Sequence, residues 1–500
     1  MDSKIAIAPH DPLPLSHELD ENGFPIGSSS TDDDDDGDYE GYGDGDGEGR
    51  DVEDSAIADE SSDAVSTFAA DFYGSGTDWS SLVAAEEEGR KEKKGGLVQR
   101  SLLQMWGIKK PKEYEEGSGG MARNLGRKRR RSAMGGEEHV DRVDRRKGQE
   151  MKLDRPRVCP FYKKIPGTPF TVDAFRYGQI EGCLGYFLSH FHHDHYGGLS
   201  KRWSHGPIYC SSLTARLLKM CLSVNSLYIC PLELDTEYDI EGVKVTMLDA
   251  NHCPGAAVIH FRLSDGRTYL HSGDFRACKL MHSHPLLLNH RINVLYLDTT
   301  YLNPKYRFPP KEDVVDFVVK KTHNCLKKQP RTLVVVGAYS IGKENVYLAI
   351  SQSLEVPIYA NASRRRILQS FGWPELSGRL CSSGQSSPLH VLPLSFLRHE
   401  VLNLKEYLKT LNKRFTAILA FRPTGWTFSE STGNQLDLIK PSTKGNVTIY
   451  GVPYSEHSSF TELRDFVKFL RPEKIIPTVN IGNAASRDKM QAYIREWLKV

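Results

Sequence analysis

A short run of histidines and one aspartate constrains this chain more than any other feature. The segment SHFHHDHYGGL, residues 189–199, places five ionisable side chains within six positions directly after an apolar, strand-like run. Polar groups without partners would be costly there. Alternation along an extended chain points His190 and His192 the same way. Asp194 and His195 can then face a second position. Imidazoles with a carboxylate suit zinc or manganese, so the segment predicts a metal-binding loop rather than a packed or solvated histidine cluster.

Two more candidate ligands stand at the ends of later strand-like runs. His252 lies in the turn NHCPG after the run 243–248, and Asp274 follows the run 269–272 in the segment SGDF. Rigid scaffolds often carry chemistry on loops at strand ends. Each residue alone is a weak sign of a metal site, but together the two supply candidates to complete the ligand shell that the histidine segment begins.

From about residue 157 the chain alternates strand-like and helix-like segments. Short apolar runs end in Asp, His or Gly, and longer runs repeat apolar residues at spacings of three and four. The strand-like runs cover residues 184–189, 243–248, 269–272, 294–297, 333–336, 417–421, 447–450 and 475–479. The helix-like runs cover residues 311–328, 343–354, 460–470 and 486–499. This alternation predicts an α/β fold.

The first 150 residues have a different composition. They are rich in Gly, Asp, Ser and Glu and poor in β-branched and aromatic residues, so they cannot bury enough apolar surface to offset chain entropy. Residues 32–54 hold 13 acidic residues and one Arg, and residues 123–147 hold 10 Lys and Arg, whereas the whole chain has a formal charge of +1. We expect a disordered region 1–150 that is first acidic and then basic.

One compact cationic run lies within this region. It consists of Arg127, Lys128, Arg129, Arg130 and Arg131 and has Gly-rich flanks that keep it accessible. Nuclear import signals and phosphate-contacting arms both require such a run. Import into the nucleus is the favoured interpretation, and a merely solvated charge run is the alternative.

A second island in the same region is amphipathic. Residues 99–106, QRSLLQMW, place Gln99, Leu102, Met105 and Trp106 at a spacing compatible with a short helical turn that docks in a groove. The segment resembles a degenerate peptide that binds the DNA sliding clamp. A stray amphipathic turn in a linker is an equally good interpretation, because such short patterns recur by chance.

Composition also excludes several classes of protein. No window approaches eighteen consecutive apolar residues, and the first thirty residues lack the pattern of a secretory signal, so we expect neither a membrane span nor secretion. The nine cysteines are an odd number, are widely spaced and include no C-x-x-C pair. This pattern argues for a reducing compartment and against a disulfide framework or a small zinc finger.

Taken together and in this order, the motifs H-x-H-x-D-H, N-H-C-P-G and S-G-D resemble those of the metallo-β-lactamase superfamily. The resemblance implies a first metal held by His190, His192, His252 and Asp274. It implies a second metal held by Asp194, His195 and the bridging Asp274. It also implies that Asp173, in the segment FTVD, supports the histidine loop from behind.

Three later residues resemble motifs of the β-CASP group of that superfamily, which acts on nucleic acids. They are Asp298 in LDTTY, His457 in PYSEHSS and Val479 in IPTVN. RNA-processing members typically carry His at the last position, whereas Val is typical of DNA-directed members. With the segments YSIGKE from residue 339 and RPTGW from residue 422, residues 157–498 resemble the DNA cross-link repair nucleases, the family that contains Artemis and Apollo.

This resemblance implies an α/β fold of a particular kind. We expect a metallo-β-lactamase αββα sandwich formed by residues 151–306 and 443–500, with an inserted α/β β-CASP domain at residues 307–442. The disordered region 1–150 would precede the sandwich. The insertion would cap the metal cleft and leave a groove for a DNA strand.

The implied activity is metal-dependent 5′ to 3′ hydrolysis of DNA in damage repair, especially of interstrand cross-links. The catalytic residues would be Asp194, Asp274, Asp298 and His457, the last two as a pair. The cofactor would be one tightly held Zn²⁺, with a weaker second site for Zn²⁺, Mg²⁺ or Mn²⁺, because Val479 cannot be a ligand. The partner would be DNA, single-stranded or with a free 5′ end.

Three further residues are candidates for binding the phosphate of such an end. Ser455, Ser458 and Lys343 would donate hydrogen bonds to its oxygens. A solvated lysine at a helix start is the alternative for Lys343. A turn, or a cap for the helix near residue 460, is the alternative for the two serines.

Other functions compete with this one. An RNA endonuclease would use the same chemistry, but Val479 counts against it. A hydrolase of small esters or lactams would need neither the long insertion nor Asp298 with His457. A damage-recruited scaffold on an inactive metal fold would have lost ligands, whereas all six ligand positions and Asp173 are filled.

Overall fold

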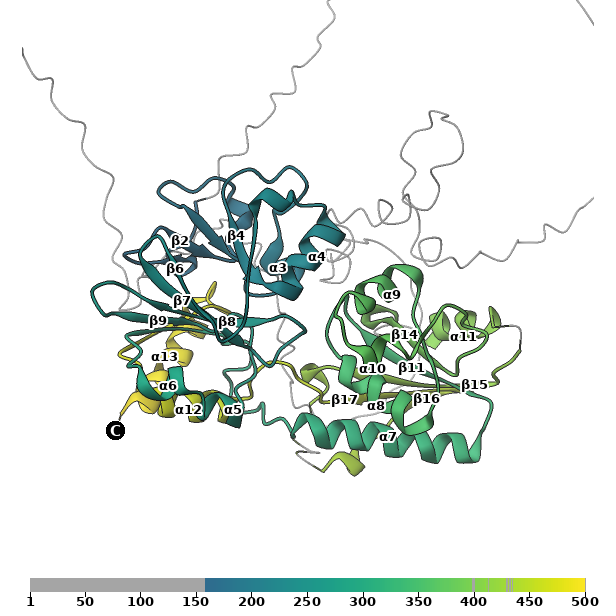
Figure 1. The fold of residues 1–500 in the computed structure, drawn as a ribbon. Coiled ribbons are helices and arrows are strands. Elements are labelled where there is room, and N and C mark those ends of the chain that lie inside the picture. Colours follow the sequence, from purple (N-terminus) through teal and green to yellow (C-terminus); the bar gives the residue numbers. More distant parts are fainter. Residues whose placement is uncertain are drawn as a thin grey trace, which may run out of the picture. The chain divides into compact units, whose positions relative to one another are not determined.

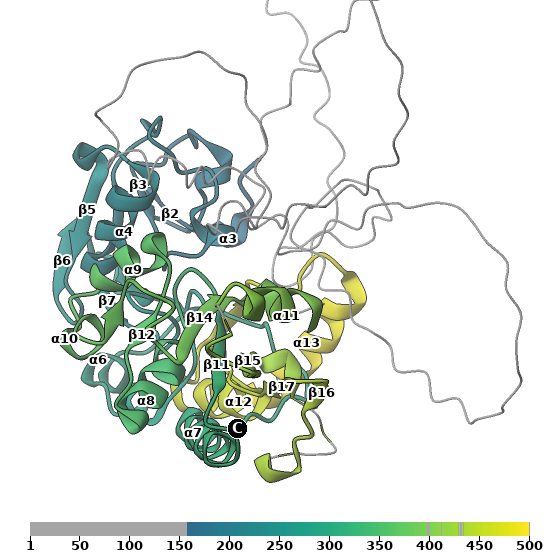
Figure 2. The ribbon, with the colours of Figure 1, turned by 90° about the vertical axis from the view of Figure 1, so that its right-hand side faces the viewer.

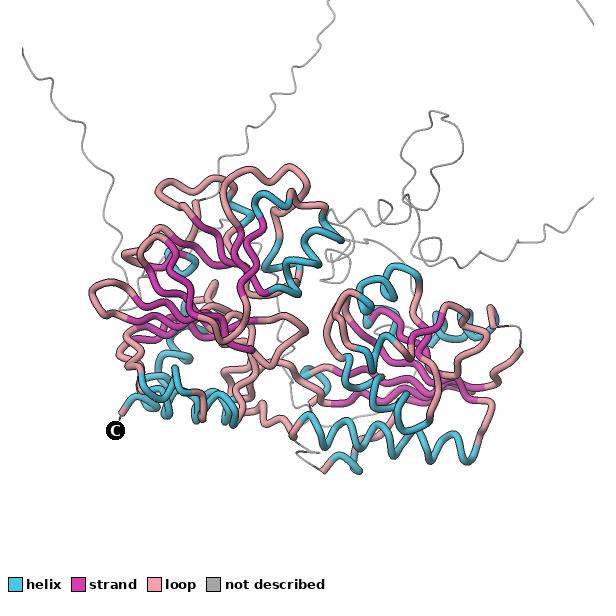
Figure 3. Tube along the Cα trace, in the orientation of Figure 1, coloured by secondary structure: helices cyan, strands magenta, loops and turns pink. Residues whose placement is uncertain are grey.

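The computed structural model describes residues 158–397, 401–411, 413–428, 430, 433 and 435–499. The region 1–150, the clamp-like segment at 99–106 and the basic run at 127–131 lie outside these described residues. Helices and strands alternate along the described part of the chain, as Figure 3 shows, and the expected α/β fold is confirmed.

Five short strands form the first sheet, in the order β1-β2-β3-β4-β5. The β1–β2 pair is antiparallel, and the other neighbouring strands run parallel. The strands are β1 (Lys164–Ile165), β2 (Phe170–Val172), β3 (Gly185–Phe187), β4 (Ile208–Ser211) and β5 (Ile229–Leu232). Asp173 and the histidine segment directly follow β2 and β3, so the parallel pairing of these strands brings them to one edge of the sheet.

Six strands form the second sheet, in the order β18-β10-β9-β8-β7-β6. It is antiparallel from β6 to β9, and β10 runs parallel to both β9 and β18. The strands are β6 (Glu237–Ile240), β7 (Val243–Asp249), β8 (Ala257–Arg262), β9 (Thr268–His271), β10 (Val294–Leu297) and β18 (Lys474–Pro477). Strand β18 lies about 180 residues after β10 in the sequence, yet it pairs with β10. The second sheet is therefore continuous although the inserted residues interrupt it in the sequence.

The two sheets share one apolar core because their side chains alternate between two faces. In β3, Phe187 packs in a cluster with Val245 and Phe261 of the second sheet, and all three are fully buried. Its neighbours Tyr186 and Leu188 belong to a different cluster, which includes residues of the covering helices. Alternation with a period of two thus buries one face against the other sheet and the opposite face against helices.

Helices lie on the outer faces of both sheets (Figure 1). They are α3 (His193–Tyr196), α4 (Ser212–Leu222), α5 (Lys279–His282), α6 (Pro285–Asn289), α12 (Phe460–Leu470) and α13 (Ala484–Leu498). Helix α12 shows why a helix begins where it does: Ser459 accepts from the backbone N–H of Glu462, whose side chain accepts from the backbone N–H of Ser459. The result is the expected αββα metallo-β-lactamase sandwich.

A third sheet of seven strands carries the insertion, in the order β13-β12-β14-β11-β15-β17-β16 (Figure 2). All neighbours are parallel except β16 and β17. The strands are β11 (Thr332–Ala338), β12 (Ile358–Tyr359), β13 (Leu380–Cys381), β14 (Leu389–Pro393), β15 (Ala417–Pro423), β16 (Ser442–Lys444) and β17 (Val447–Val452). The helices are α7 (Lys311–Lys328), α8 (Glu344–Leu354), α9 (Ala362–Gln369), α10 (Pro374–Ser377) and α11 (Val401–Lys409).

This third sheet extends beyond the boundary that the sequence suggested. The β-CASP insertion was expected to end at residue 442, but β17 continues to Val452 and pairs with β15 along six residues. The apolar run 447–450 had no feature that tied it to either half, since pairing across a sheet is not written in local sequence. The helices expected at 311–328 and 460–470 have the observed bounds of α7 and α12.

The described residues also bear on the cysteines and on a membrane span. All nine cysteines are free thiols, and four of them are buried. Among the helices of the described residues, none has both the length and the apolar character needed to cross a bilayer.

Candidate active site

Asp173 fastens the histidine segment to the first sheet. It follows β2 in a left-handed backbone conformation with φ 52°. Its Oδ1 accepts from the backbone N–H of Ser189 at 2.8 Å, and its Oδ2 accepts from the Ser189 hydroxyl and from His195 Nδ1, both at 2.7 Å. Burial favours the neutral acid, but the charge and hydrogen bond of His195 outweigh it and lower the pKa of Asp173.

Two imidazoles of the histidine segment are oriented from behind through this anchor. His190 is fully buried, and its Nδ1 donates to the Ser189 hydroxyl at 2.9 Å. His195 Nδ1 donates to Asp173. A neutral imidazole has one donor and one acceptor nitrogen, so the outward bond of His190 leaves its lone pair on Nε2. The outward bond of His195 likewise directs its Nε2 at the centre of the site.

Two further imidazoles are oriented in the same way by backbone carbonyls. His252 Nδ1 donates to the carbonyl oxygen of Glu456 at 2.8 Å, which leaves its Nε2 lone pair for the site. His192 Nε2 makes a longer contact of 3.4 Å with the carbonyl oxygen of Ile341, so its inner nitrogen is Nδ1. Metal-binding histidines in proteins almost always donate their outer N–H to such an acceptor.

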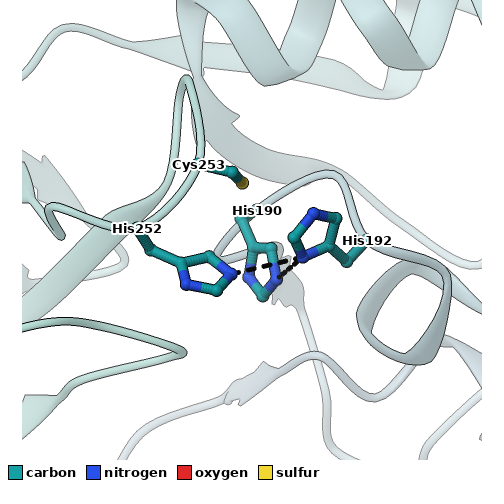
Figure 4. A group of neighbouring side chains, drawn as sticks. All are labelled: His190, His192, His252 and Cys253. Carbon is teal, nitrogen blue, oxygen red and sulfur yellow. Dashed lines mark hydrogen bonds between the residues drawn. The ribbon is translucent and has the colours of Figure 1, made fainter. Parts of the chain in front are cut away.

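The inner nitrogens converge on one point, together with a carboxylate oxygen. His192 Nδ1 lies 2.9 Å from His190 Nε2 and 3.2 Å from His252 Nε2 (Figure 4). Asp274 Oδ2 lies 3.6 Å from His190 Nε2 and 3.8 Å from His252 Nε2. Donors about 2.0–2.1 Å from a tetrahedral zinc ion would be about 3.4 Å apart. These four side chains therefore fit a divalent metal, and their lone pairs would repel one another without a cation.

A second group of donors adjoins the first. His195 Nε2 lies 3.4 Å from Asp194 Oδ2 and 3.3 Å from Asp274 Oδ2. Asp274 therefore lies between the two groups, where a bridging ligand would stand. Six residues that the sequence singled out are thus brought together, and Asp173 supports them from outside.

The protonation of the histidines differs between the two groups. Burial, together with the neighbouring imidazoles, holds the pKa values of His190 and His252 well below the ordinary value. Burial opposes charge on His195 as well, but the carboxylates around its ring outweigh burial and hold its pKa well above the ordinary value. Neutral rings offer lone pairs to a metal, so the first group is the better prepared of the two.

Cys253 is a neighbour of the first group that the sequence did not propose as a ligand. Its sulfur lies beside His190, His192 and His252 (Figure 4). Burial, reinforced by nearby carboxylates, holds the pKa of the thiol well above its ordinary value. Because the thiolate is the form that binds metals, this environment disfavours Cys253 as a ligand.

A glycine allows the loop that carries Asp274 to approach the histidine segment. Gly273 has φ 53°, and a Cβ added there would lie 2.7 Å from the Cβ of Ser189. No larger residue fits without displacing the segment that holds His190. The S-G-D motif therefore has a steric reason as well as a chemical one.

Asp298 and His457 form the pair that the sequence suggested. Asp298 follows β10, and its Oδ2 accepts from His457 Nδ1 at 2.8 Å. Asp298 Oδ1 accepts from the backbone N–H and hydroxyl of Thr300, which fixes the carboxylate. Burial opposes charge on His457, but Asp298 outweighs burial and raises its pKa. A nitrogen of His457 lies within 4.8 Å of ligand atoms of His252 and Asp274.

A buried ion pair stands beside the histidines. Lys343 Nζ donates to Glu456 Oε2, and the backbone N–H of Lys343 donates to Glu456 Oε1 at 2.9 Å. Both side chains are at most 7% exposed. Burial opposes charge on Glu456, but Lys343 and then His252 lower the pKa of Glu456 to about 2. The solvated lysine considered from the sequence is therefore not what the structure contains.

A cavity of about 140 Å³ connects these groups. Its lining includes metal-site residues from His192 to Asp274, and also Lys343, Ser455 and His457. Ser458 does not belong to the lining: its hydroxyl is buried, donates to the carbonyl oxygen of Phe275 and accepts from the backbone N–H of Ala277. Of the three suggested phosphate donors, the structure brings two to the cavity.

Two residues that position the site were not proposed from the sequence. Arg276 is buried after Asp274, and it donates to the carbonyl oxygen of Ser455 at 2.9 Å and to Glu462 at 3.0 Å. It thereby ties the loop after β9 to the loop that carries His457. Glu456 was not proposed from the sequence either, although it lies next to His457. The one sign in the sequence was a carboxylate among the small polar residues of the segment PYSEHSS.

The comparisons with known proteins agree with this geometry. A family model described as "DNA repair metallo-beta-lactamase" matches residues 374–483. The chain is 58% identical over 450 residues to the DNA cross-link repair protein SNM1 of Arabidopsis thaliana, and the match covers 86% of this chain and 90% of that protein. The chain belongs to the SNM1 family of DNA cross-link repair proteins.

Two further relatives show how far the family likeness extends. The chain is 49% identical over 343 residues to the human DNA cross-link repair 1A protein, a match that covers 69% of this chain and 32% of that protein. It is 33% identical over 328 residues to the 5′ exonuclease Apollo of Danio rerio, a match that covers 63% of this chain and 52% of that protein. The chain therefore spans about a third of the human DNA cross-link repair 1A protein and nine tenths of the Arabidopsis protein.

Proposed function

We propose that this protein is a metal-dependent nuclease that removes nucleotides from the 5′ end of a DNA strand during cross-link repair. The observation that carries the proposal is the convergence of four donors, His190, His192, His252 and Asp274, beside the Asp298–His457 pair. Three of these donors and His457 line one cavity. The names of the relatives supply the substrate, since they are a DNA cross-link repair protein and a 5′ exonuclease.

The proposed cofactor is Zn²⁺ in the site of three histidines and Asp274. Asp194 and His195 would hold a second divalent ion, Zn²⁺, Mg²⁺ or Mn²⁺, with Asp274 between the two. When bound, such a metal supplies a water of lowered pKa for attack on phosphorus and neutralises charge on the phosphate. Asp173 and Ser189 keep the imidazole lone pairs directed at it.

The chain's own residues perform the remaining tasks. The ring of His457 is held by Asp298 through Nδ1, so its other nitrogen is the one that meets the phosphate or the departing oxygen. Lys343 has three N–H donors on Nζ and gives one to Glu456, which leaves donors for a phosphate oxygen. The Ser455 hydroxyl lies in the same lining, although it donates to the carbonyl oxygen of His457 in the absence of substrate.

A nuclease for RNA is the nearest competing function. Val479 lies in the lining of the cavity, and its apolar side chain offers neither a metal ligand nor a hydrogen-bonding group. A histidine at this position would place an imidazole in the same lining. The apolar side chain therefore supports the DNA assignment over the RNA one.

The recruitment proposals concern residues outside the described structure. We propose that the basic run 127–131 directs the protein to the nucleus, where its DNA substrate lies. Residues 99–106 are proposed to bind the sliding clamp. Deleting either segment should change location or clamp binding without changing the nuclease rate of the purified protein.

The deciding experiment offers the full-length protein matched 3′-labelled single strands of DNA and RNA, each with a 5′-phosphate or a 5′-hydroxyl. We expect a shortening ladder on DNA alone, stronger with the phosphate and lost in Asp194→Ala. Preferred cleavage of RNA, or internal cuts indifferent to the 5′ group, would contradict the substrate assignment. Absence of metal-dependent cleavage on every strand would favour a scaffold function.

A further inference from the structure

The cavity has two chemically different walls. One wall carries the metal-site residues and the Lys343–Glu456 pair. The other comprises the uncharged lining residues of the loops after β10, β15 and β18, which are Thr300, Tyr301, Thr424, Gly425, Trp426 and Val479. Tyr339 also lines the cavity but belongs with the charged wall, because its ring centroid lies 5.8 Å from Lys343 Nζ. A nucleotide has the same division, since its phosphate is charged and its base is an uncharged aromatic ring.

Trp426 is the exposed member of this uncharged wall. Trp426 is 44% exposed, whereas Tyr301 and Phe308 nearby are 3% and 7% exposed. The Trp426 ring lies 4.9 Å from Tyr301 at an interplanar angle of 57°, and 5.8 Å from Tyr306 at 89°. The buried ring of Tyr301 and the partly buried ring of Tyr306 thus pack against the indole, while almost half of Trp426 stays accessible in the lining of the cavity.

The backbone that carries Trp426 is held in place. Trp426 lies in a single turn of 3₁₀ helix, η7 (Gly425–Thr427), which Thr424 caps by accepting from the Trp426 N–H. A Cβ on Gly425 would lie 2.6 Å from the hydroxyl oxygen of Tyr301, so glycine is needed for this close approach. An indole that is fixed before a ligand arrives loses little conformational entropy on binding.

Tyr301 links this indole to the catalytic pair. Its ring lies 5.9 Å from the His457 ring in an edge-to-face arrangement and 4.9 Å from Trp426 on the other side. Because Tyr301 follows Asp298 by three residues, the same loop positions both the pair and the support of the indole. A strand whose phosphate lies at His457 would carry its bases past Trp426.

We propose that Trp426, supported by Tyr301, is the stacking surface for a nucleobase of the DNA strand being degraded. The inference rests on the proposed function and deepens it by assigning recognition of the base to a particular residue. Every base has an aromatic face, so this contact tolerates any sequence. Trp426 therefore strengthens binding of the strand near its 5′ end without selecting a particular base.

The test measures binding of single-stranded DNA by fluorescence anisotropy, in the full-length Asp194→Ala variant so that the strand is not cut. Intact strands are compared with strands in which one of the first three nucleotides is abasic. We expect an abasic residue at one of these positions to weaken binding about tenfold, the effect of losing one stacked base. Adding Trp426→Ala should weaken binding of the intact strand by a similar factor and remove the difference between intact and abasic strands.

Three matched variants separate stacking from structural support. Trp426→Phe keeps an aromatic face and should retain most of the discrimination. Trp426→Leu fills the space without one, and should lose discrimination even if Trp426→Ala fails to fold. Phe161→Leu alters a 36% exposed aromatic residue that is not part of the cavity lining, and should change nothing.

The outcomes distinguish this inference from the proposed function. Equal binding of intact and abasic strands by the Asp194→Ala protein, or discrimination that survives in Trp426→Leu, would overturn the stacking assignment even if the wild type degrades DNA. The expected abasic pattern in a wild type that cleaves no strand would keep the stacking surface and overturn the nuclease. Failure to bind any DNA strand would overturn both.

Discussion

Two groups of buried side chains beside the cavity balance their charge differently. The histidines of the first donor group, with Asp274, need a metal, whereas the Lys343–Glu456 pair does not. The histidines of the first donor group are neutral rings whose lone pairs meet around Asp274, so they are balanced only when a cation joins them. Lys343 and Glu456 neutralise each other directly and are complete without a ligand. The first arrangement needs a metal, whereas the second stabilises the site without one and leaves Lys343 N–H donors in the lining of the cavity.

This comparison predicts opposite consequences of mutation on the two sides. Removing one partner of the buried ion pair leaves an uncompensated buried charge, so protein stability should fall. Removing an element of the metal site should reduce metal affinity and activity, with less effect on the free energy of unfolding.

The largest effect should come from Lys343→Met. The change leaves Glu456 buried without its partner, and breaking a buried pair in this way costs about 3–5 kcal/mol. Urea unfolding of the metal-free protein measures the loss. Adding Glu456→Leu to Lys343→Met should recover most of it, because two apolar groups then replace two charges.

A surface pair provides the matched control. Glu237 Oε2 lies 2.7 Å from Arg262 Nη2, but both side chains are about 40% exposed. Water already solvates them, so Glu237→Gln should cost less than about 1 kcal/mol. A similar loss in Glu237→Gln and Lys343→Met would show that burial does not set the scale of these effects.

The metal side of the cavity was largely predictable from sequence, and this too follows from its architecture. His190, His192, Asp194 and His195 lie within six residues, and His252 and Asp274 each follow a strand that the apolar pattern revealed. Backbone geometry at strand ends carries such residues to one place. Short motifs with strict chemistry therefore encoded both the ligands and their approximate positions.

Motifs also indicated Asp298 and His457, but several contacts in the other parts of the cavity could not be predicted, because they arise only through tertiary packing. Lys343 and Glu456 are 113 positions apart, and the partnership depends on how α8 meets the loop before α12. Ser458 was predicted to face a phosphate, but its hydroxyl bonds to the backbone of Phe275 and Ala277. Likewise, the third sheet's extension to Val452 depends on pairing between distant strands.

A smaller effect should come from Glu344, which adjoins the buried pair without being neutralised by it. Burial and then the charge of Glu456 raise its pKa from 4.5 to about 7. The folded state therefore binds more protons than the unfolded state between these values, so stability falls as pH rises through this window and stays reduced above it. A shift from 4.5 to about 7 corresponds to roughly 3 kcal/mol.

Glu344→Gln tests this assignment because glutamine cannot ionise but can still accept from the backbone N–H of Gly342. Unfolding free energies measured from pH 5 to pH 8 should decline less in the variant than in the wild type. The variant should be the more stable of the two at pH 8. Parallel profiles would show that the pKa of Glu344 is not raised in the folded protein.

The smallest effect in the series should come from Asp173→Asn, which alters the support of the metal site without removing a ligand. An asparagine can still accept one hydrogen bond, but it lacks the negative charge that, 2.7 Å from His195 Nδ1, makes the ring a more basic ligand. Outer partners of this kind contribute about 10–100-fold to metal affinity or activity, which is about 1.4–2.7 kcal/mol. Competition with a zinc chelator measures affinity directly, without relying on nuclease activity.

The control for this last comparison is a carboxylate–histidine contact on the surface. Asp235 Oδ1 lies 3.2 Å from His284 Nε2, and the Asp235 side chain is 66% exposed. Asp235→Asn makes the same chemical change as Asp173→Asn, but it should leave zinc affinity unaltered. If Asp173→Asn also binds zinc as the wild type does, then Ser189 alone is sufficient to orient the histidines, and the role of Asp173 is confined to stability.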